Sequence, residues 1–203
     1  EIMPSLVGSE MCIRDRHVLW LIWVIDMFLQ LVPVKSKLAI GSQKLFAYKY
    51  HPILEAINYS RLRDYVVSTT KAAYKVFIFW GALMAVIGEL YFGGIVSKIG
   101  LFMISVTFYV CDLICVLIWC PFRLIMKNKC CTTCRIFNWD HIMMFLPLVF
   151  MGGFFSLSLV AMAFIVWAVW ELCIIIHPER FCEMTNTAVS YTHLRAHETR
   201  HDL

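Results

Sequence analysis

Long apolar runs are the feature that most constrains this chain. Three of them, at residues 17–34, 72–92 and 99–120, approach the ~20 mostly apolar residues that a helix needs to cross a membrane. A fourth covers residues 142–176. The runs do not alternate polar with apolar residues as barrel strands do. Because only helices and closed barrels satisfy backbone polar groups in lipid, we expect an all-α fold, a polytopic bundle of four or five transmembrane segments.

Composition supports this class. The chain is 61% hydrophobic and 16% charged, whereas a soluble domain carries roughly 25% charged residues. Its net charge of +4 comes from lysine and arginine concentrated between the apolar runs. We therefore expect a lipid bilayer as the main partner, and no nucleic acid.

The fourth run is too long for one crossing. As a single helix, residues 142–176 would extend ~52 Å at 1.5 Å per residue. Pro147, Gly152 and Gly153 interrupt it. Three arrangements remain open: two short crossings, a re-entrant half-helix before one crossing, or an interfacial helix before one crossing.

Both ends differ abruptly in composition from the apolar chain between them. EIMPSLVGSEMCIRDR at residues 1–16 and AVSYTHLRAHETRHDL at residues 188–203 together resemble translated sequencing-adapter read-through. Segments of this kind are set aside in fold reasoning. The resemblance implies that residues 177–187 are a native tail, which is followed here by foreign sequence, and that the native chain continued further at one or both ends.

The loops differ in basic residues. Residues 35–71 carry seven lysines and arginines and residues 121–141 carry four, whereas residues 93–98 carry one. The positive-inside rule then places both long loops in the cytoplasm, with the chain in the plasma or inner membrane. Within the first loop we expect a surface helix from Pro52 that leads into the second run. The arginines of this helix either contact anionic lipid headgroups or only reflect the positive-inside rule.

Three cysteines lie within five residues in the second loop, in the sequence KNKCCTTCRIFNWDH. A cytoplasmic loop is reducing, which favours metal binding over a structural disulfide. A Cys-x-x-Cys pair can hold zinc, and basic neighbours favour the thiolate. The sequence therefore predicts a zinc-type site, for which the candidate ligands are Cys130, Cys131, Cys134, Asp140, His141 and Cys182.

Cys182 depends on the number of crossings. If residues 142–176 cross twice, Cys182 returns to the side of the cysteine loop, whereas a single crossing places it on the opposite side. Other interpretations of the loop thiols are palmitoylation, a redox pair, an iron–sulfur cluster and thiols without a role. A Cu(I) path along Met143, Met144 and Met151 is a further alternative.

Acidic residues within apolar runs are costly and often mark function. Asp26 and Asp112 lie deepest, whereas Glu89 and Glu171 lie near the ends of their runs. On the third run a polar face continues from Asp112 at helical spacing, and its other members are Ser105, Tyr109 and Cys115. This face fits either a solute or proton path, or a structural network that pairs Asp112 with Lys75 or a serine.

Small residues recur on one face of the second run at Gly81, Ala85 and Gly88. Such spacing allows close helix packing in lipid. We interpret these three positions as a helix contact, and we expect a homo-oligomer or a membrane partner protein.

Three functions follow. The first is an integral membrane protein whose zinc-type loop has a structural or interaction role. The alternative is a small transporter or channel that uses Asp112 and Asp26. The third is a membrane-embedded enzyme that acts on lipid, quinone or a thiol, and it is the least favoured because no His-Glu-x-x-His, nucleophile-elbow or paired intramembrane histidine motif supports it.

Overall fold

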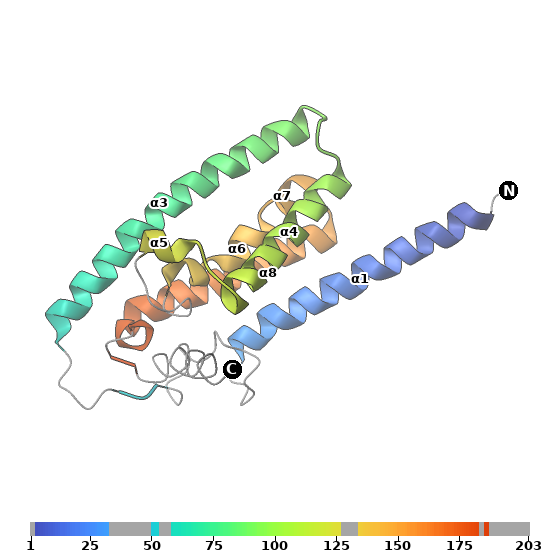
Figure 1. The fold of residues 1–203 in the computed structure, drawn as a ribbon. Coiled ribbons are helices and arrows are strands. Elements are labelled where there is room, and N and C mark those ends of the chain that lie inside the picture. The colour runs from blue at the N-terminus through green and yellow to red at the C-terminus, as the bar shows by residue number, and fades with distance from the viewer. Residues whose placement is uncertain (1–2, 33–49, 53–57, 127–133, 183–184, 187–203) are drawn as a thin grey trace, which may run out of the picture.

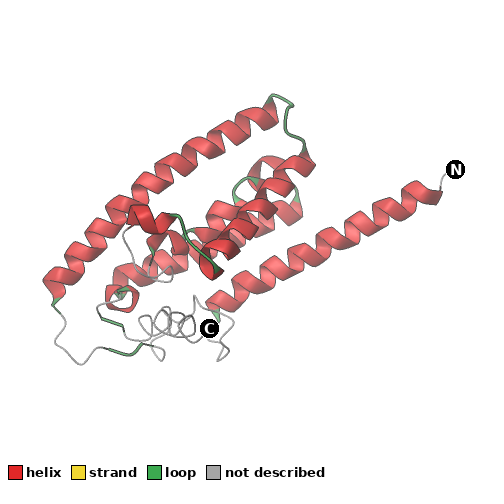
Figure 2. Cartoon of the chain, in the orientation of Figure 1, coloured by secondary structure: helices red, strands yellow, loops and turns green. Residues whose placement is uncertain are grey.

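The computed structural model describes residues 3–32, 50–52, 58–126, 134–182 and 185–186 (Figure 1). Regular structure in this part is helical (Figure 2), with one isolated bridge between Pro52 and Asn186. The all-α prediction is thus confirmed. Cys130, Cys131 and residues 188–203 lie outside the described residues.

The described part of the chain contains the following helices, in chain order. They are α1 (Met3–Leu31), α3 (Tyr59–Phe92), α4 (Lys98–Leu117), α5 (Phe122–Met126), η3 (Arg135–Asn138), α6 (Asp140–Phe145), α7 (Leu148–Met151), α8 (Phe154–Ile176) and η4 (Pro178–Phe181).

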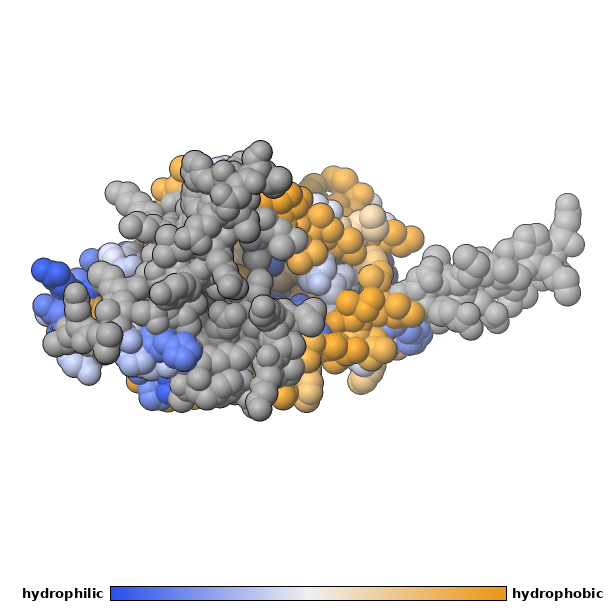
Figure 3. Space-filling view, turned by 60° about the horizontal axis from the view of Figure 1, so that its bottom comes forward, coloured by the Kyte–Doolittle hydropathy of each residue, from blue (hydrophilic) through white to orange (hydrophobic). Residues whose placement is uncertain are grey.

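Three helices are long and apolar enough to cross a membrane: α3, the Lys98–Cys115 part of α4, and α8. Two shorter apolar helices, His17–Leu31 and Asp140–Met151, accompany them. Large apolar side chains cover the flanks, and hydrophilic residues gather where α3 begins (Figure 3). These features fit a membrane protein, and a count of four or five crossings stays a prediction.

Helix α3 begins earlier than the second run alone indicated. The Asn58 side chain caps it, accepting hydrogen bonds from the backbone N–H groups of Ser60 and Arg61 at 3.1 and 3.2 Å. Asparagine is a strong N-cap because it satisfies donors that have no partner within the helix. The expected start at Pro52 differs, since Pro52 lies in the bridge and α3 then runs unbroken to Phe92.

The fourth apolar run forms a hairpin. Gly152 and Gly153 turn the chain with φ of 66° and 85°, so that α8 folds back along α6 and α7 (Figure 1). The Asp140–Met151 arm is ~18 Å long at 1.5 Å per residue, well short of a ~30 Å hydrocarbon core. The hairpin places the start of α6 and the end of α8 at the same end of the bundle, and the choice among the three arrangements that the sequence left open stays a prediction.

Helix α8 is the centre of the bundle, because α1, α6 and α7 all pack on it. The main core joins Trp23 and Met27 of α1 to Phe145 of α6 and to Ala163 and Trp170 of α8. The ends of α1, α4 and α8 and the starts of α3 and α6 gather at one end of the bundle (Figure 1). We call this the loop end.

Helix α3 contacts η3, α5 and η4 along its first half, and further along the helix Met84 and Ile87 meet Leu101 of α4. Gly88 allows a close approach, since a Cβ there would lie 3.0 Å from Cζ of Phe150. Gly81 has no such neighbour among the described residues, and Ala85 is exposed. Within this chain, the predicted small-residue contact is thus formed by Gly88.

Candidate functional site

Four ionisable side chains from three helices converge near the loop end. Asp26 comes from α1, Asp112 from α4, and Asp140 and His141 open α6. We call them the carboxylate–histidine cluster. The sequence had treated Asp26 and Asp112 as transport candidates and His141 as a zinc ligand, and the fold brings these together.

His141 is held between two carboxylates. Its Nδ1 contacts Oδ1 of Asp140, and its Nε2 lies 3.4 Å from Oδ2 of Asp26. The Gln30 amide Nε2 lies 3.2 Å from the same His141 nitrogen. His141 is only 3% exposed, whereas the Asp26 side chain is 42% exposed. One side of the cluster is thus accessible through Asp26.

The start of α6 positions the inner pair. Asp140 is the first residue of the helix, where its negative charge complements the helix dipole. Its Oδ1 also accepts the backbone N–H of His141 at 2.5 Å. The carboxylate of Asp140 is therefore oriented by the backbone, and the ring of His141 is oriented by that carboxylate.

The ionisation of His141 follows from these neighbours. His141 lies in the short helix α6, outside the three long apolar helices. Burial lowers its pKa, but the charge and hydrogen bond of Asp140 and those of Asp26 raise it by more, to about 10. The ring is therefore an imidazolium at neutral pH, with an N–H to give each carboxylate.

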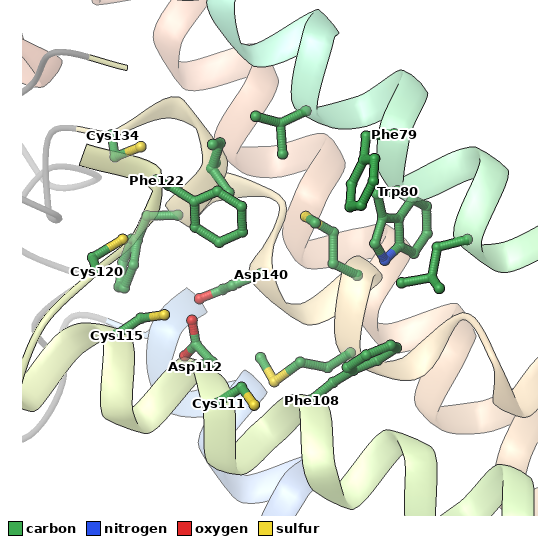
Figure 4. Close-up of a pocket in the computed structure, with 16 residues that line it drawn as sticks. Phe79, Trp80, Phe108, Cys111, Asp112, Cys115, Cys120, Phe122, Cys134 and Asp140 are labelled. Atoms are coloured by element: carbon green, nitrogen blue, oxygen red, sulfur yellow. The ribbon is translucent and has the colours of Figure 1, made fainter. Parts of the chain in front are cut away.

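Asp112 adds a third carboxylate. It lies in the last turns of α4, and its side chain points toward that of Asp140 (Figure 4). The ionisable side chains around it are those of Asp140, His141 and Asp26, and the thiol of Cys120 also lies near it. Lys75, the cation we had considered from the sequence, is exposed on α3. Asp112 thus faces mainly acidic groups, with His141 as the balancing charge.

The predicted polar face of α4 lies toward the bundle interior. Ser105 is fully buried, and its hydroxyl has no hydrogen-bond partner among the described residues. Tyr109 packs on Trp23 with ring centroids 6.0 Å apart. Cys115 lies beside Cys120, within the electrostatic reach of Asp112. The polar face therefore contacts α1 through Tyr109 and reaches a neighbouring cavity through Asp112 and Cys115.

A cavity of about 210 Å³ adjoins the cluster, between α3, α4 and α6. Asp112 and Asp140 border it at one side, and the rest of its wall is apolar apart from thiols (Figure 4). The thiols belong to Cys111, Cys115, Cys120 and Cys134. The sequence did not predict this cavity, because the cavity arises from the separation between α3 and α4, which only the tertiary structure sets.

Of the cysteines in the predicted zinc-type site, Cys134 and Cys182 lie among the described residues. Cys134 and Cys182 are both buried, and η3 and η4, which adjoin them, both contact the C-terminal part of α8 at the loop end. His141, a predicted ligand, instead turns its two ring nitrogens to carboxylates. Among the described residues, no group of three or more candidate ligands is placed to hold a metal ion.

A second polar network, around Arg135 and Glu171, lies beside the carboxylate–histidine cluster. Arg135 of η3 donates to Glu171 of α8 and to Thr70 of α3, and Trp139 donates its indole N–H to the same glutamate at 2.8 Å. The sequence had placed Glu171 near interfacial water. Only tertiary structure could pair it with Arg135, because no local spacing relates the two residues.

Comparisons with known proteins identify no relative: no protein-family model, curated protein or solved structure matches this chain. The function is therefore inferred from the chain's own residues.

Proposed function

We propose that this chain is a membrane transporter or channel in which the carboxylate–histidine cluster binds a proton or a small cation. One observation carries the proposal: Asp26 of α1, Asp112 of α4, and Asp140 and His141 of α6 meet although they come from three separate helices. Ionisable residues inside membrane bundles are costly, and they commonly form ion or proton pathways.

The charges of the cluster favour a cationic ligand. Three carboxylates face one imidazolium, so the ionised cluster has an excess of negative charge. Two carboxylates that point at each other are not both ionised at low cost. A proton or a cation that enters the cluster relieves this repulsion, and its release restores it.

Access supports transport over a purely structural role. Asp26 is partly exposed on one side of His141, and Asp112 borders the cavity on the other. A proton on His141 or a carboxylate thus has neighbours in two directions. A cluster that only joined helices would need no cavity beside it.

Proton flux into liposomes tests the proposal. The purified protein is reconstituted with a pH-sensitive dye inside, and flux is driven by a potassium diffusion potential. We expect Asp112→Asn to reduce the initial rate at least tenfold. Glu89→Gln, which changes an exposed carboxylate of α3, serves as the matched control and keeps the wild-type rate.

Thermal unfolding of the same variants separates the two roles. Transport predicts that Asp112→Asn stays folded while it loses flux. A wild-type protein without flux above that of empty liposomes would refute the proposal, as would an Asp112→Asn variant with the wild-type rate.

The zinc-type loop is a second candidate function, as a structural or interaction site. It is supported by the return of the chain through the Gly152–Gly153 turn, which brings Cys182 to the same end as Cys134. Elemental analysis of the purified protein tests it, beside a variant with Cys130, Cys131 and Cys134 changed to serine. Near-stoichiometric zinc that is lost in the variant supports the site, and no zinc in either protein removes it.

A further inference from the structure

The cavity beside the cluster opens toward the flank of the bundle. Its rim includes Phe79 and Leu83 of α3, which are 74% and 37% exposed, and the exposed Cys111 of α4. Phe79 and Leu83 belong to the exposed apolar surface that fits a lipid environment. A molecule dissolved in the bilayer therefore has a direct way in between α3 and α4.

The inner side of the cavity is anionic. The carboxylates of Asp112 and Asp140 lie there, and they point toward each other (Figure 4). Asp140 is 7% exposed and already bonded to His141, whereas Asp112 has two further carboxylates, those of Asp140 and Asp26, near it. A positively charged group at this position would gain attraction from both carboxylates.

Aromatic rings form much of the wall. Trp80 of α3, Phe108 of α4 and Phe122 of α5 surround the cavity on different sides (Figure 4). Aromatic faces attract cations and pack well against apolar rings. Binding pockets typically combine such walls with a few polar groups that fix orientation.

The size of the cavity limits the occupant. An apolar cavity of ~150 Å³ accommodates benzene, so about 210 Å³ accommodates one such ring with a short substituent. Larger ligands would have to extend past the rim. The cavity therefore suits a compact ring that carries one small charged arm.

From this geometry, and resting on the proposed function, we propose that the cavity binds a small lipophilic amine that enters from the bilayer. Its ammonium group lies between Asp112 and Asp140, and its apolar body lies among Trp80, Phe108 and Phe122. The amine is then the cation that the carboxylate–histidine cluster takes up.

Fluorine NMR of the protein in lipid nanodiscs tests the proposal with three probes of similar shape. They are 4-fluorobenzylamine, which is a cation at neutral pH, the neutral 4-fluorobenzyl alcohol, and the anionic 4-fluorobenzoate. Empty nanodiscs correct for partition into lipid. We expect the amine to bind with a dissociation constant on the order of 0.1–1 mM, the range of a ligand this small. The alcohol should bind at least tenfold more weakly, and the benzoate should not bind.

Three variants locate the site. Asp112→Asn should weaken amine binding at least tenfold and leave the alcohol unchanged. Val76→Phe fills the cavity and should abolish binding of both probes, whereas Ile78→Phe, two residues away and 71% exposed, should leave both unchanged. Thermal unfolding confirms that each variant is folded.

The outcomes separate this inference from the proposed function. Amine and alcohol binding of equal strength, or no amine binding to the wild type, would overturn the inference. Proton flux that depends on Asp112 without amine binding would leave the transport proposal in place. Amine binding that depends on Asp112 without any flux would uphold the binding site and reject transport.

Discussion

Arg135 and Glu171 form an ion pair in which both side chains are largely buried, with 13% and 15% of their surfaces exposed and 2.5 Å between Nη2 and Oε2. The pair joins η3 to α8. Thr70 and Trp139 complete it by hydrogen bonds, so α3 and the start of α6 are tied to the same point. This network is the main polar link between α3 and the bundle at the loop end.

Breaking this pair on one side should destabilise the protein strongly. Arg135→Met leaves Glu171 buried without its cation, and Glu171→Met leaves the guanidinium without its anion. Loss of one partner of a buried pair costs about 3 kcal/mol. Thermal or chemical unfolding in detergent measures the loss in each variant.

The double variant is the informative comparison for this pair. Removing both charges leaves no buried ion without a partner, so it should cost less than either single change. Arg63→Met, at an exposed position on α3, should change stability by no more than ~0.5 kcal/mol. Additive losses in the double variant would show that the two residues do not act as a pair.

Stability should also depend on the proton of His141. Its folded pKa of about 10 lies above the ordinary value of 6.5, so the folded state binds this proton more tightly than the unfolded state does. The stabilisation is complete below pH ~6.5 and is lost as the pH rises through 10. It amounts to a few kcal/mol, on the order set by ~1.4 kcal/mol for each unit of pKa difference.

Unfolding temperatures at pH 6, 8 and 10 measure this dependence. His141→Gln should lose the part of the pH dependence that His141 supplies, and its stability should fall less between pH 6 and 10. His177→Gln is the control, because that side chain is 40% exposed and bonds to Glu179. Equal pH dependence in wild type and His141→Gln would contradict the assigned charge of the ring.

The close approach at Gly88 predicts a position-specific effect on α3. Gly88→Leu drives a side chain into the ring of Phe150 and should cost about 1–3 kcal/mol, as overpacking does. Gly81→Leu, on the same helix, meets open space and should cost little. Phe150→Ala should rescue Gly88→Leu in a double-mutant cycle, and a failure to rescue would show that another contact limits the site.

The glycine turn predicts backbone strain without a steric clash. Gly152 and Gly153 have φ of 66° and 85° with ψ of −173° and 159°, a region that is essentially open to glycine alone. A Cβ at either position would touch nothing within 4 Å, so Gly152→Ala and Gly153→Ala should each cost about 1–3 kcal/mol through the backbone. Unfolding beside Gly81→Ala as control measures this, and a cost below that of the control would refute it.

The elements that local sequence determines were predictable. The apolar runs gave the helices, and Gly152 and Gly153 marked the break in the fourth run. Asn58 was a readable N-cap before α3, although we placed the start at Pro52. The folding of α6 and α7 back along α8 depended on long-range packing, which no local pattern encodes.

The candidate site was predictable only in part. Burial cost singled out Asp112 and Asp26 from sequence, because a carboxylate in an apolar run demands an explanation. Their association with His141 was not predictable, since it depends on the rotation of α1 and α4 and on the position of α6. His141 had been assigned to the cysteines, which are its neighbours in sequence, whereas its neighbours in space are carboxylates.

Helix α3 is a stiff wall of the cavity. Arg135 holds it at Thr70 near one end and Phe150 meets it at Gly88 near the other, and between these points Ala73, Val76, Trp80 and Met84 pack on the bundle. Helices curve with radii of ~60–100 Å without breaking, so a stretch of ~27 Å can deflect by about 1 Å. An occupant larger than the cavity would therefore have to bend α3 and displace these packed side chains together.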